Sequence, residues 1–170
     1  MDLKTKIRNI KDFPEKGIIF RDITTLIGDG EAYRDVIDQF VEKIRPMNVD
    51  IILVLDARGF LVGSPVAYAL KKGVVPIRKA GKLPAETYQV EYKLEYGSDK
   101  FEMHKDAIKP GMRVAVLDDL LATGGTAKAA CDLVEMAGGT VVTIGFVIEL
   151  NDLGGREKLT GYDTFSLVQY

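Results

Sequence analysis

The sequence has very few of the residues that usually bind metals or form disulfides. Its 170 residues include one cysteine, Cys131, one histidine, His104, and no tryptophan. A single cysteine excludes an internal disulfide, and one His with one Cys excludes a His/Cys metal cluster. No Ser/His or Cys/His catalytic pair stands out either. We therefore expect Cys131 to be a packing residue.

Long apolar runs and a surplus of basic charge are also missing. No run approaches the roughly 18 apolar residues of a membrane span, and the first ten residues, MDLKTKIRNI, lack the apolar core of a signal peptide. The net charge of −2 does not indicate a nucleic-acid partner, although local basic clusters could bind a phosphorylated small molecule. We expect one soluble, cytoplasmic domain over residues 1–170, with no membrane or nucleic-acid partner.

The spacing of apolar residues predicts alternating helices and strands. Helical patterns cover residues 1–12, 31–45, 65–72 and 127–137, and buried strands are predicted at 50–56, 74–77, 113–117 and 140–148. Residues 13–26 are predicted to be irregular or briefly extended, and 151–170 form a tail. This order predicts an α/β fold, a parallel sheet flanked by helices with right-handed crossovers.

An insertion separates the strand at 74–77 from the strand at 113, because the intervening segment is longer than a crossover needs. Tyr88, Val90 and Tyr92 alternate with polar residues, GSDK follows as a turn, and Phe101 and Met103 alternate again. This pattern predicts a two-stranded β-ribbon. A lone hairpin is marginally stable in water, so we expect it to be mobile.

The stretch VAVLDDLLATGGT (114–126) combines an apolar strand, two carboxylates and a glycine loop that opens a helix. Such a loop turns backbone N–H groups outward at the positive end of the helix dipole, which suits a phosphate. A nucleoside triphosphate P-loop would need a Lys that is missing here, and GxGxxG is absent. Two acids or two glycines alone favour a solvated helix start and a tight turn. The whole arrangement instead favours a site for a ribose 5-phosphate.

This stretch resembles the phosphoribosyl pyrophosphate (PRPP) signature of the type I phosphoribosyltransferases, in the form typical of adenine phosphoribosyltransferases. The blocks GIIFRDIT, DARGF, IRKAGKLP, LEYG and IELNDLGGREKL are similar to further segments of that family, in family order. The resemblance covers almost the whole chain. It implies a parallel-sheet core, a hood built from the N-terminal and C-terminal segments, and a lid β-hairpin at about 80–106.

The resemblance also implies a purine salvage enzyme. Such an enzyme transfers the 5-phosphoribosyl group from PRPP to adenine and gives AMP and pyrophosphate. Mg²⁺ would be bound mainly through PRPP, with no direct protein ligand, and the chain would form a homodimer. The reaction passes through an oxocarbenium-like state while pyrophosphate leaves, so cations near the leaving group should stabilise its charge.

Several residues receive roles from the resemblance. Glu95 would act on a purine-ring proton, and Tyr96 would contact the reacting site from the lid. Asp118 and Asp119 would hold and stabilise the ribose. A cis peptide at Asp56–Ala57 is implied as well. The implied 5-phosphate contacts are Ala122, Thr123, Gly124, Gly125 and Thr126. The implied pyrophosphate contacts are Arg58, Lys79 and Lys82. The implied adenine contacts are the main chain of Ile19 and Arg21 with the side chains of Phe20 and Leu150.

Each assignment has a simpler alternative. Phe20 and Leu150 could be core residues, Lys82 a solvated surface residue, and Glu95 part of the polar face of a strand. Two other functions also stay open, a PRPP-sensing regulator without turnover and a phosphoribosyltransferase for another purine base. A regulator should lack the lid acid or Arg58, and an oxopurine requires a different set of hydrogen-bond donors. An assay of AMP formation separates these readings.

Overall fold

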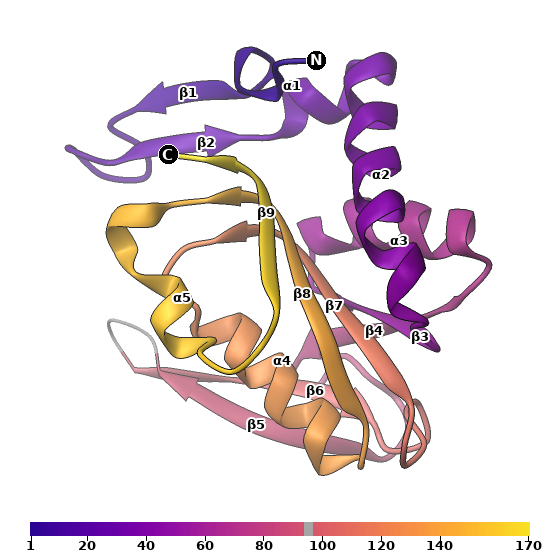
Figure 1. The fold of residues 1–170 in the computed structure, drawn as a ribbon. Helices are drawn as coiled ribbons and strands as arrows, with labels where there is room; N and C mark the ends of the chain where they lie inside the picture. Colours follow the sequence, from indigo (N-terminus) through magenta and orange to yellow (C-terminus); the bar gives the residue numbers. More distant parts are fainter. Residues whose placement is uncertain (94–96) are drawn as a thin grey trace.

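One mixed β-sheet forms the centre of the molecule (Figure 1). The computed structural model describes residues 1–93 and 97–170, and within these residues the sheet has seven strands. Their order across the sheet is β5 (Thr87–Lys93), β6 (Ser98–His104), β4 (Gly73–Lys79), β3 (Ile51–Leu55), β7 (Arg113–Leu121), β8 (Thr140–Glu149) and β9 (Thr164–Gln169). The run from β4 to β9 pairs in parallel, which confirms the predicted α/β fold.

Helices cover both faces of this sheet (Figure 1). On one face α2 (Gly30–Ile44) and α3 (Arg58–Leu70) bury their apolar stripes, and α4 (Gly125–Met136) covers the other. Strand β3 is enclosed between these layers, which explains why its sequence IILVL is apolar without alternation. Cys131 of α4 is buried in the core, as expected.

Helix α3 begins earlier than the sequence pattern predicts. The expected helix at 65–72 is in fact α3, which starts at Arg58 and contains Pro65 in its interior. Proline has no N–H, so the carbonyl of Leu61 loses its helical donor. The hydroxyl of Tyr33 on α2 donates to that carbonyl instead. Helix α3 continues through Pro65, so Arg58 lies in its first turn rather than in a loop.

The insertion forms the predicted hairpin, but the hairpin is not isolated. Strand β6 pairs antiparallel with both β5 and β4, so the ribbon extends the edge of the main sheet. Phe101 and Met103 are buried, and the ring of Phe101 stacks on Tyr92 with centroids 4.6 Å apart. The expectation of a lone, marginally stable ribbon is therefore wrong for this part of the hairpin, because its apolar face packs into the core beside α4.

Both ends of the sequence contain strands; the one at 19–22 lies in the segment expected to be irregular or briefly extended, and the others were not predicted. The expected helix at 1–12 is limited to a 3-10 turn at Leu3–Lys6, and β1 (Arg8–Lys11) then pairs antiparallel with β2 (Ile19–Asp22). A short helix, α1 (Thr24–Ile27), follows. The tail contains α5 (Gly155–Lys158) and the strand β9, which pairs with β8. Backbone pairing with a neighbouring strand decides β1 and β9, and the periodicity within each segment does not report it.

The two ends of the chain meet above the carboxyl ends of β7 and β8 (Figure 1). The ring of Tyr170 contacts two cations, with Arg21 Cζ 3.9 Å and Lys4 Nζ 4.9 Å from its centroid. Its backbone N–H donates to Glu149 O at 2.9 Å, and its carbonyl accepts from Asn151 N–H at 2.9 Å. Tyr170 thus joins β2 to the end of β8.

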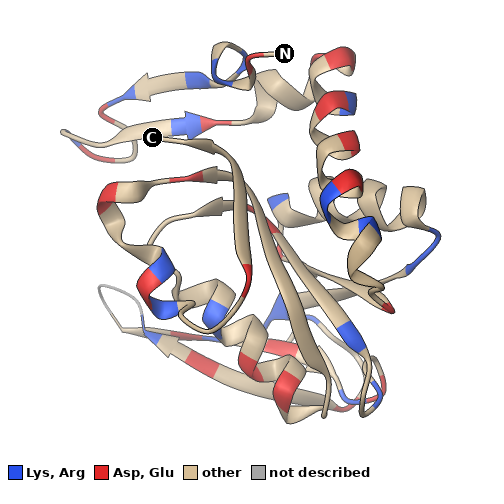
Figure 2. Cartoon of the chain, viewed as in Figure 1, with Lys and Arg blue, Asp and Glu red and all other residues tan. Residues whose placement is uncertain are grey.

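Acidic and basic residues are interspersed over the same elements, and Figure 2 shows both signs on α2 and on α5. Among the helices of the described residues, none combines the length and apolar character needed to cross a membrane.

Candidate active site

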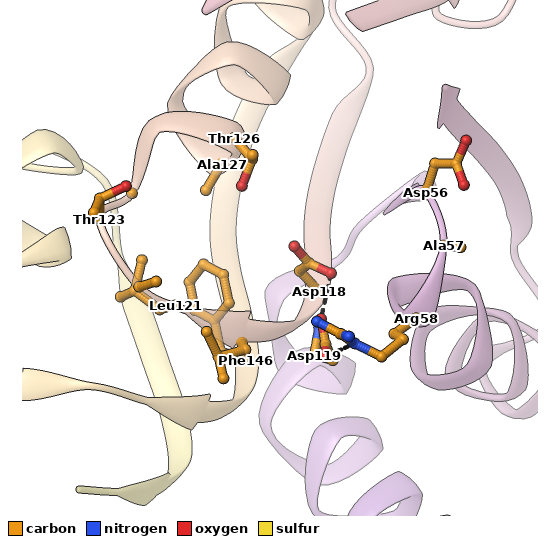
Figure 3. Close-up of a pocket in the computed structure, with 13 residues that line it drawn as sticks. Asp56, Ala57, Arg58, Asp118, Asp119, Leu121, Thr123, Thr126, Ala127 and Phe146 are labelled. Atoms are coloured by element: carbon orange, nitrogen blue, oxygen red, sulfur yellow. Dashed lines mark hydrogen bonds and ion pairs between the residues drawn. The ribbon is translucent and has the colours of Figure 1, made fainter. Parts of the chain in front are cut away.

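A cavity of about 420 Å³ opens at the carboxyl ends of β3 and β7, beside the start of α4 (Figure 3). Ligands of open α/β sheets bind at this edge. Its lining combines carboxylates, one guanidinium, a glycine loop and an apolar floor. The lining residues are Asp56, Ala57, Arg58, Asp118, Asp119, Leu120, Leu121, Ala122, Thr123, Gly124, Thr126, Ala127 and Phe146.

The glycine loop ends at the N-cap of α4, where Gly124 adopts a φ of +84°. This left-handed conformation favours glycine. A side chain at Gly124 would also collide with α5, since its Cβ would lie 2.5 Å from the carbonyl oxygen of Gly155. No side chain of the described residues caps α4, whereas Asp29 caps α2 through the N–H groups of Glu31 and Ala32. The first N–H groups of α4 can therefore bind an anion.

The two acids of the motif lie within β7 rather than after it, because the strand continues to Leu121. Asp119 is buried and accepts a hydrogen bond from Arg58, whose Nε lies 2.5 Å from Oδ2. Asp118 is half-buried, and desolvation together with the neighbouring charge of Asp119 raises the pKa of its carboxyl well above the ordinary value. The carboxyl of Asp118 therefore resists ionisation.

The start of α3 approaches β7 so closely that only glycine fits beside Arg58. A Cβ at Gly59 would lie 2.8 Å from Asp118 Oδ1 and 3.2 Å from the carbonyl oxygen of Leu117. This close approach brings the guanidinium of Arg58 to Asp119 (Figure 3).

Asp56 forms the opposite side of the cavity. Arg78 Nε and Lys82 Nζ each lie 3.3 Å from its Oδ2. Burial opposes ionisation of this carboxyl, but the hydrogen bonds from Lys82 and Arg78 outweigh it and hold its pKa below the ordinary value. The peptide bond between Asp56 and Ala57 is cis, which confirms the expectation from the DARG block.

The model of the phosphoribosyl transferase domain matches residues 26–168. The adenine phosphoribosyltransferase of Clostridium perfringens is 61% identical over 170 residues, which cover 100% of this chain and 99% of that protein. The chain belongs to the adenine phosphoribosyltransferase family.

Solved structures of this family superpose over nearly the whole fold. The enzyme of Thermoanaerobacter pseudethanolicus gives a TM-score of 0.96 at 51% identity, covering 99% of this chain and 98% of that one. The enzyme of Saccharomyces cerevisiae gives 0.94 at 40% identity, covering 98% and 96%. That structure is a complex with D-2,5-dideoxy-2,5-imino-altritol 1,6-bisphosphate and adenine.

The cavity brings together many of the residues that the family resemblance selected. Arg58, the Asp118–Asp119 pair and all of 122–126 except Gly125 line it. Gly125 instead lines a neighbouring cavity with Lys128 and Lys158. Lys82 reaches the edge of the site through Asp56, whereas Lys79 faces the hairpin, 3.8 Å from Asp99 Oδ2.

The residues selected for adenine lie outside the cavity lining but next to it. The ring of Phe20 lies 5.6 Å from Arg58 Cζ, and the N–H of Leu150 donates to Leu121 O at 2.9 Å. Ile19 and Arg21 flank Phe20 on β2. Glu95 and Tyr96 lie outside the described residues.

Six residues that line the site were not among the site residues selected from the sequence: Asp56, Ala57, Leu120, Leu121, Ala127 and Phe146. Asp56 could have been found, because it ends a buried strand beside Arg58. Leu121 and Phe146 carry no such signal, since they are apolar residues of strands and only the fold shows that they form the cavity floor.

Proposed function

We propose that this chain transfers the 5-phosphoribosyl group of PRPP to adenine and thereby forms AMP and pyrophosphate in purine salvage. The observation that supports this most is the meeting of the glycine loop, the acid pair and Arg58 in one cavity. A ligand with one phosphate, a ribose and a charged leaving group needs those three kinds of group side by side.

The loop from Ala122 to Thr126 binds the 5-phosphate in this proposal. Backbone N–H groups at the start of α4 donate to the phosphate oxygens, and the hydroxyls of Thr123 and Thr126 add donors. Asp118 and Asp119 accept from the ribose hydroxyls. Negative charge on this acid pair also stabilises positive character on the ribose ring as the leaving group departs.

Arg58, Lys79 and Lys82 bind the pyrophosphate. The C–O bond to pyrophosphate breaks with its electron pair going to the leaving oxygen, so cations beside that oxygen stabilise the transition state more than the substrate. Arg58 meets this need best because it lines the cavity, and the other two approach from the β4–β6 side.

Adenine would occupy the space between β2 and the end of β8. The main chain of Ile19 and Arg21 reads its edge, and Phe20 and Leu150 contact its two faces. N9 of adenine forms the new bond to the ribose carbon, and the purine ring loses one proton. Glu95 accepts that proton while Tyr96 closes the site, which assigns a lid role to the hairpin at about 80–106.

Mg²⁺ fits the oxygen-rich chemistry of this site. Within the described residues, no group of three or more His, Cys, Asp or Glu side chains forms a candidate metal cage. Mg²⁺ keeps several waters and is often held through substrate phosphates with one or two carboxylates. Asp118 and Asp119 are the carboxylates that could accept hydrogen bonds from its waters. When bound, the ion would neutralise charge on the pyrophosphate.

The proposal treats residues 1–170 as one domain, with a hood formed by the N-terminal and C-terminal segments. It also includes a cytoplasmic location and a homodimer. Leu61 and Tyr68, two turns apart on α3, are 45% and 87% exposed and offer an apolar surface for a second copy. Sedimentation equilibrium of the full chain tests the dimer, which a single monomeric mass would contradict.

Steady-state formation of AMP from adenine, PRPP and Mg²⁺ tests the activity, with hypoxanthine and guanine as competing bases. We expect a large preference for adenine. PRPP binding without AMP formation would favour the sensor alternative, and equal rates with an oxopurine would favour another base.

A further inference from the structure

Arg156 and Glu149 form a bidentate ion pair behind the phosphate loop. Arg156 Nε lies 2.6 Å from Glu149 Oε1, and its Nη2 lies 2.8 Å from Glu149 Oε2. Glu149 ends β8 and is only 4% exposed, and the hydroxyl of Ser166 on β9 donates to its Oε2 at 2.6 Å. Arg156 also donates from NH1 to Thr164 O at 2.8 Å. The guanidinium therefore ties α5 to both β8 and β9.

Gly155, the residue before Arg156, packs directly on the backbone of the loop. A Cβ at Gly155 would lie 2.4 Å from the carbonyl oxygen of Ala122 and 2.8 Å from Leu121 Cδ1. From the other side, a Cβ at Gly124 would lie 2.5 Å from Gly155 O. With glycine at both positions, the start of α5 forms a wall against which the loop rests, and Figure 1 shows α5 beside α4.

We propose that Arg156 and Glu149 are positioning residues for the 5-phosphate, because their ion pair fixes Gly155 against the loop. Neither side chain lines the cavity, so both act through the Gly155 backbone. A loop rich in glycine has many accessible conformations, and its N–H groups converge on a phosphate only if something outside the loop restricts them. This inference rests on the proposed function, in which residues 122–126 bind the phosphate of PRPP.

The position of the ion pair predicts an effect on the phosphate end of the substrate and not on the base. In the full-length chain, Arg156→Met keeps a long side chain but removes the guanidinium. We expect the KM for PRPP and the Kd for AMP to rise about tenfold or more, because small displacements of binding groups have large effects. The KM for adenine at saturating PRPP should change less than about twofold.

Two further variants separate positioning from folding. Arg156→Lys keeps the charge but not the bidentate geometry, so it should restore part of the PRPP affinity. Gly155→Ala leaves the ion pair in place and should still weaken PRPP binding, because its Cβ would push on Ala122. These two variants keep the test decisive if Arg156→Met does not fold.

Arg113→Met is the matched control, since Arg113 also donates to two carbonyls, Met47 O at 2.8 Å and Asn48 O at 3.1 Å, but at the opposite end of β7. It should lower the unfolding temperature without changing the KM for PRPP. The inference is overturned if Arg156→Met leaves the KM for PRPP unchanged or raises both KM values equally. A wild type that neither forms nor binds AMP overturns the proposed function itself.

Discussion

Arg58 Nε donates to Asp119 Oδ2 across 2.5 Å, so the first turn of α3 is tied to the middle of the cavity wall on β7. The proposed pyrophosphate contact and the proposed ribose contact therefore hold each other in place. Asp119 is buried, whereas the side chain of Arg58 is half exposed, which leaves the guanidinium accessible to a ligand.

Removing Arg58 should affect turnover more than product binding. Arg58→Ala should lower kcat by roughly a hundredfold, because the charge on the departing pyrophosphate loses its stabilising cation. AMP carries no pyrophosphate, so its Kd should change much less. Steady-state kinetics and calorimetric titration with AMP measure the two effects. The kcat of Arg58→Lys should lie between the kcat of the wild type and that of Arg58→Ala. Equal losses in rate and AMP affinity would contradict this role.

Replacing the proposed lid acid tests general-base catalysis. Glu95→Gln keeps the size of the side chain but removes the carboxylate, so kcat should fall by roughly a hundredfold or more while AMP affinity barely changes. Glu91→Gln, a change of the same type on β5, is the control and should keep its rate. A full rate in Glu95→Gln would remove the base assignment and leave the enzyme reading intact.

Because α3 approaches β7 closely at Gly59, we expect a side chain added at this position to destabilise the fold. Gly59→Ala should destabilise the fold by about 1–3 kcal/mol and lower kcat, because its Cβ would lie 2.8 Å from Asp118 Oδ1. Gly30→Ala is the matched control, since Gly30 is also near the start of a helix and its Cβ would meet no atom within 4 Å. Denaturant unfolding should place Gly30→Ala at or above wild-type stability. Similar losses of stability in both variants would contradict the role of close packing at Gly59.

The anchoring of the hairpin predicts that its core residue contributes to global stability. Phe101→Ala should lower the free energy of unfolding by about 3 kcal/mol or more, because Phe101 is 2% exposed and stacks on Tyr92. A flap that packed on nothing would tolerate this change. Thermal and denaturant unfolding of the full chain measure it, and a loss below about 1 kcal/mol would mean that the ribbon is only loosely attached.

We expect the folded protein to lose stability in acid as the carboxylate of Asp22 becomes protonated. The N–H of Thr24 and the guanidinium of Arg8 donate to its carboxylate and lower its pKa from 3.8 to about 2. A lowered folded-state pKa means that this stabilisation is present above pH 3.8 and is lost as the pH falls toward 2. The stability difference between wild type and Asp22→Asn should therefore shrink by at most about 2 kcal/mol over that range. A difference independent of pH would show that the contacts do not depend on ionisation.

Some of the fold was predictable because the relevant signal is local. The run IILVL has no polar face, so it indicates a central strand, and the apolar stripe of 31–45 indicates a surface helix that the structure confirms as α2. Strand β1 was missed because Leu3 and Ile7 are spaced as on a helix, although β1 pairs with β2. Strand β9 was missed because most of its residues are only partly buried, so its sequence lacks the apolar run or clear alternation of the predicted strands.

The residues of the candidate site could likewise be predicted only where their signal is local in the sequence. Residues 118–126 are contiguous and carry a recognisable motif, so the meeting of all of them except Gly125 in one cavity could be predicted. The contact between Arg58 and Asp119 could not, because it depends on how closely Gly59 lets α3 approach β7. The wall formed by Gly155 is of the same kind, since a glycine in a sequence does not tell which backbone it faces.

The contact of Tyr170 with Lys4 and Arg21 has a consequence for the order in which the site is assembled. These contacts join residues that are far apart in sequence, and the entropy lost in closing such a long loop must be spent before the contacts form. The phosphate loop, by contrast, lies between a strand and the helix that follows it. We expect pulse-labelled amides of α4 to gain protection from hydrogen exchange before those of β2 and Tyr170, so that a refolding chain acquires its anion-binding end before its base-binding end.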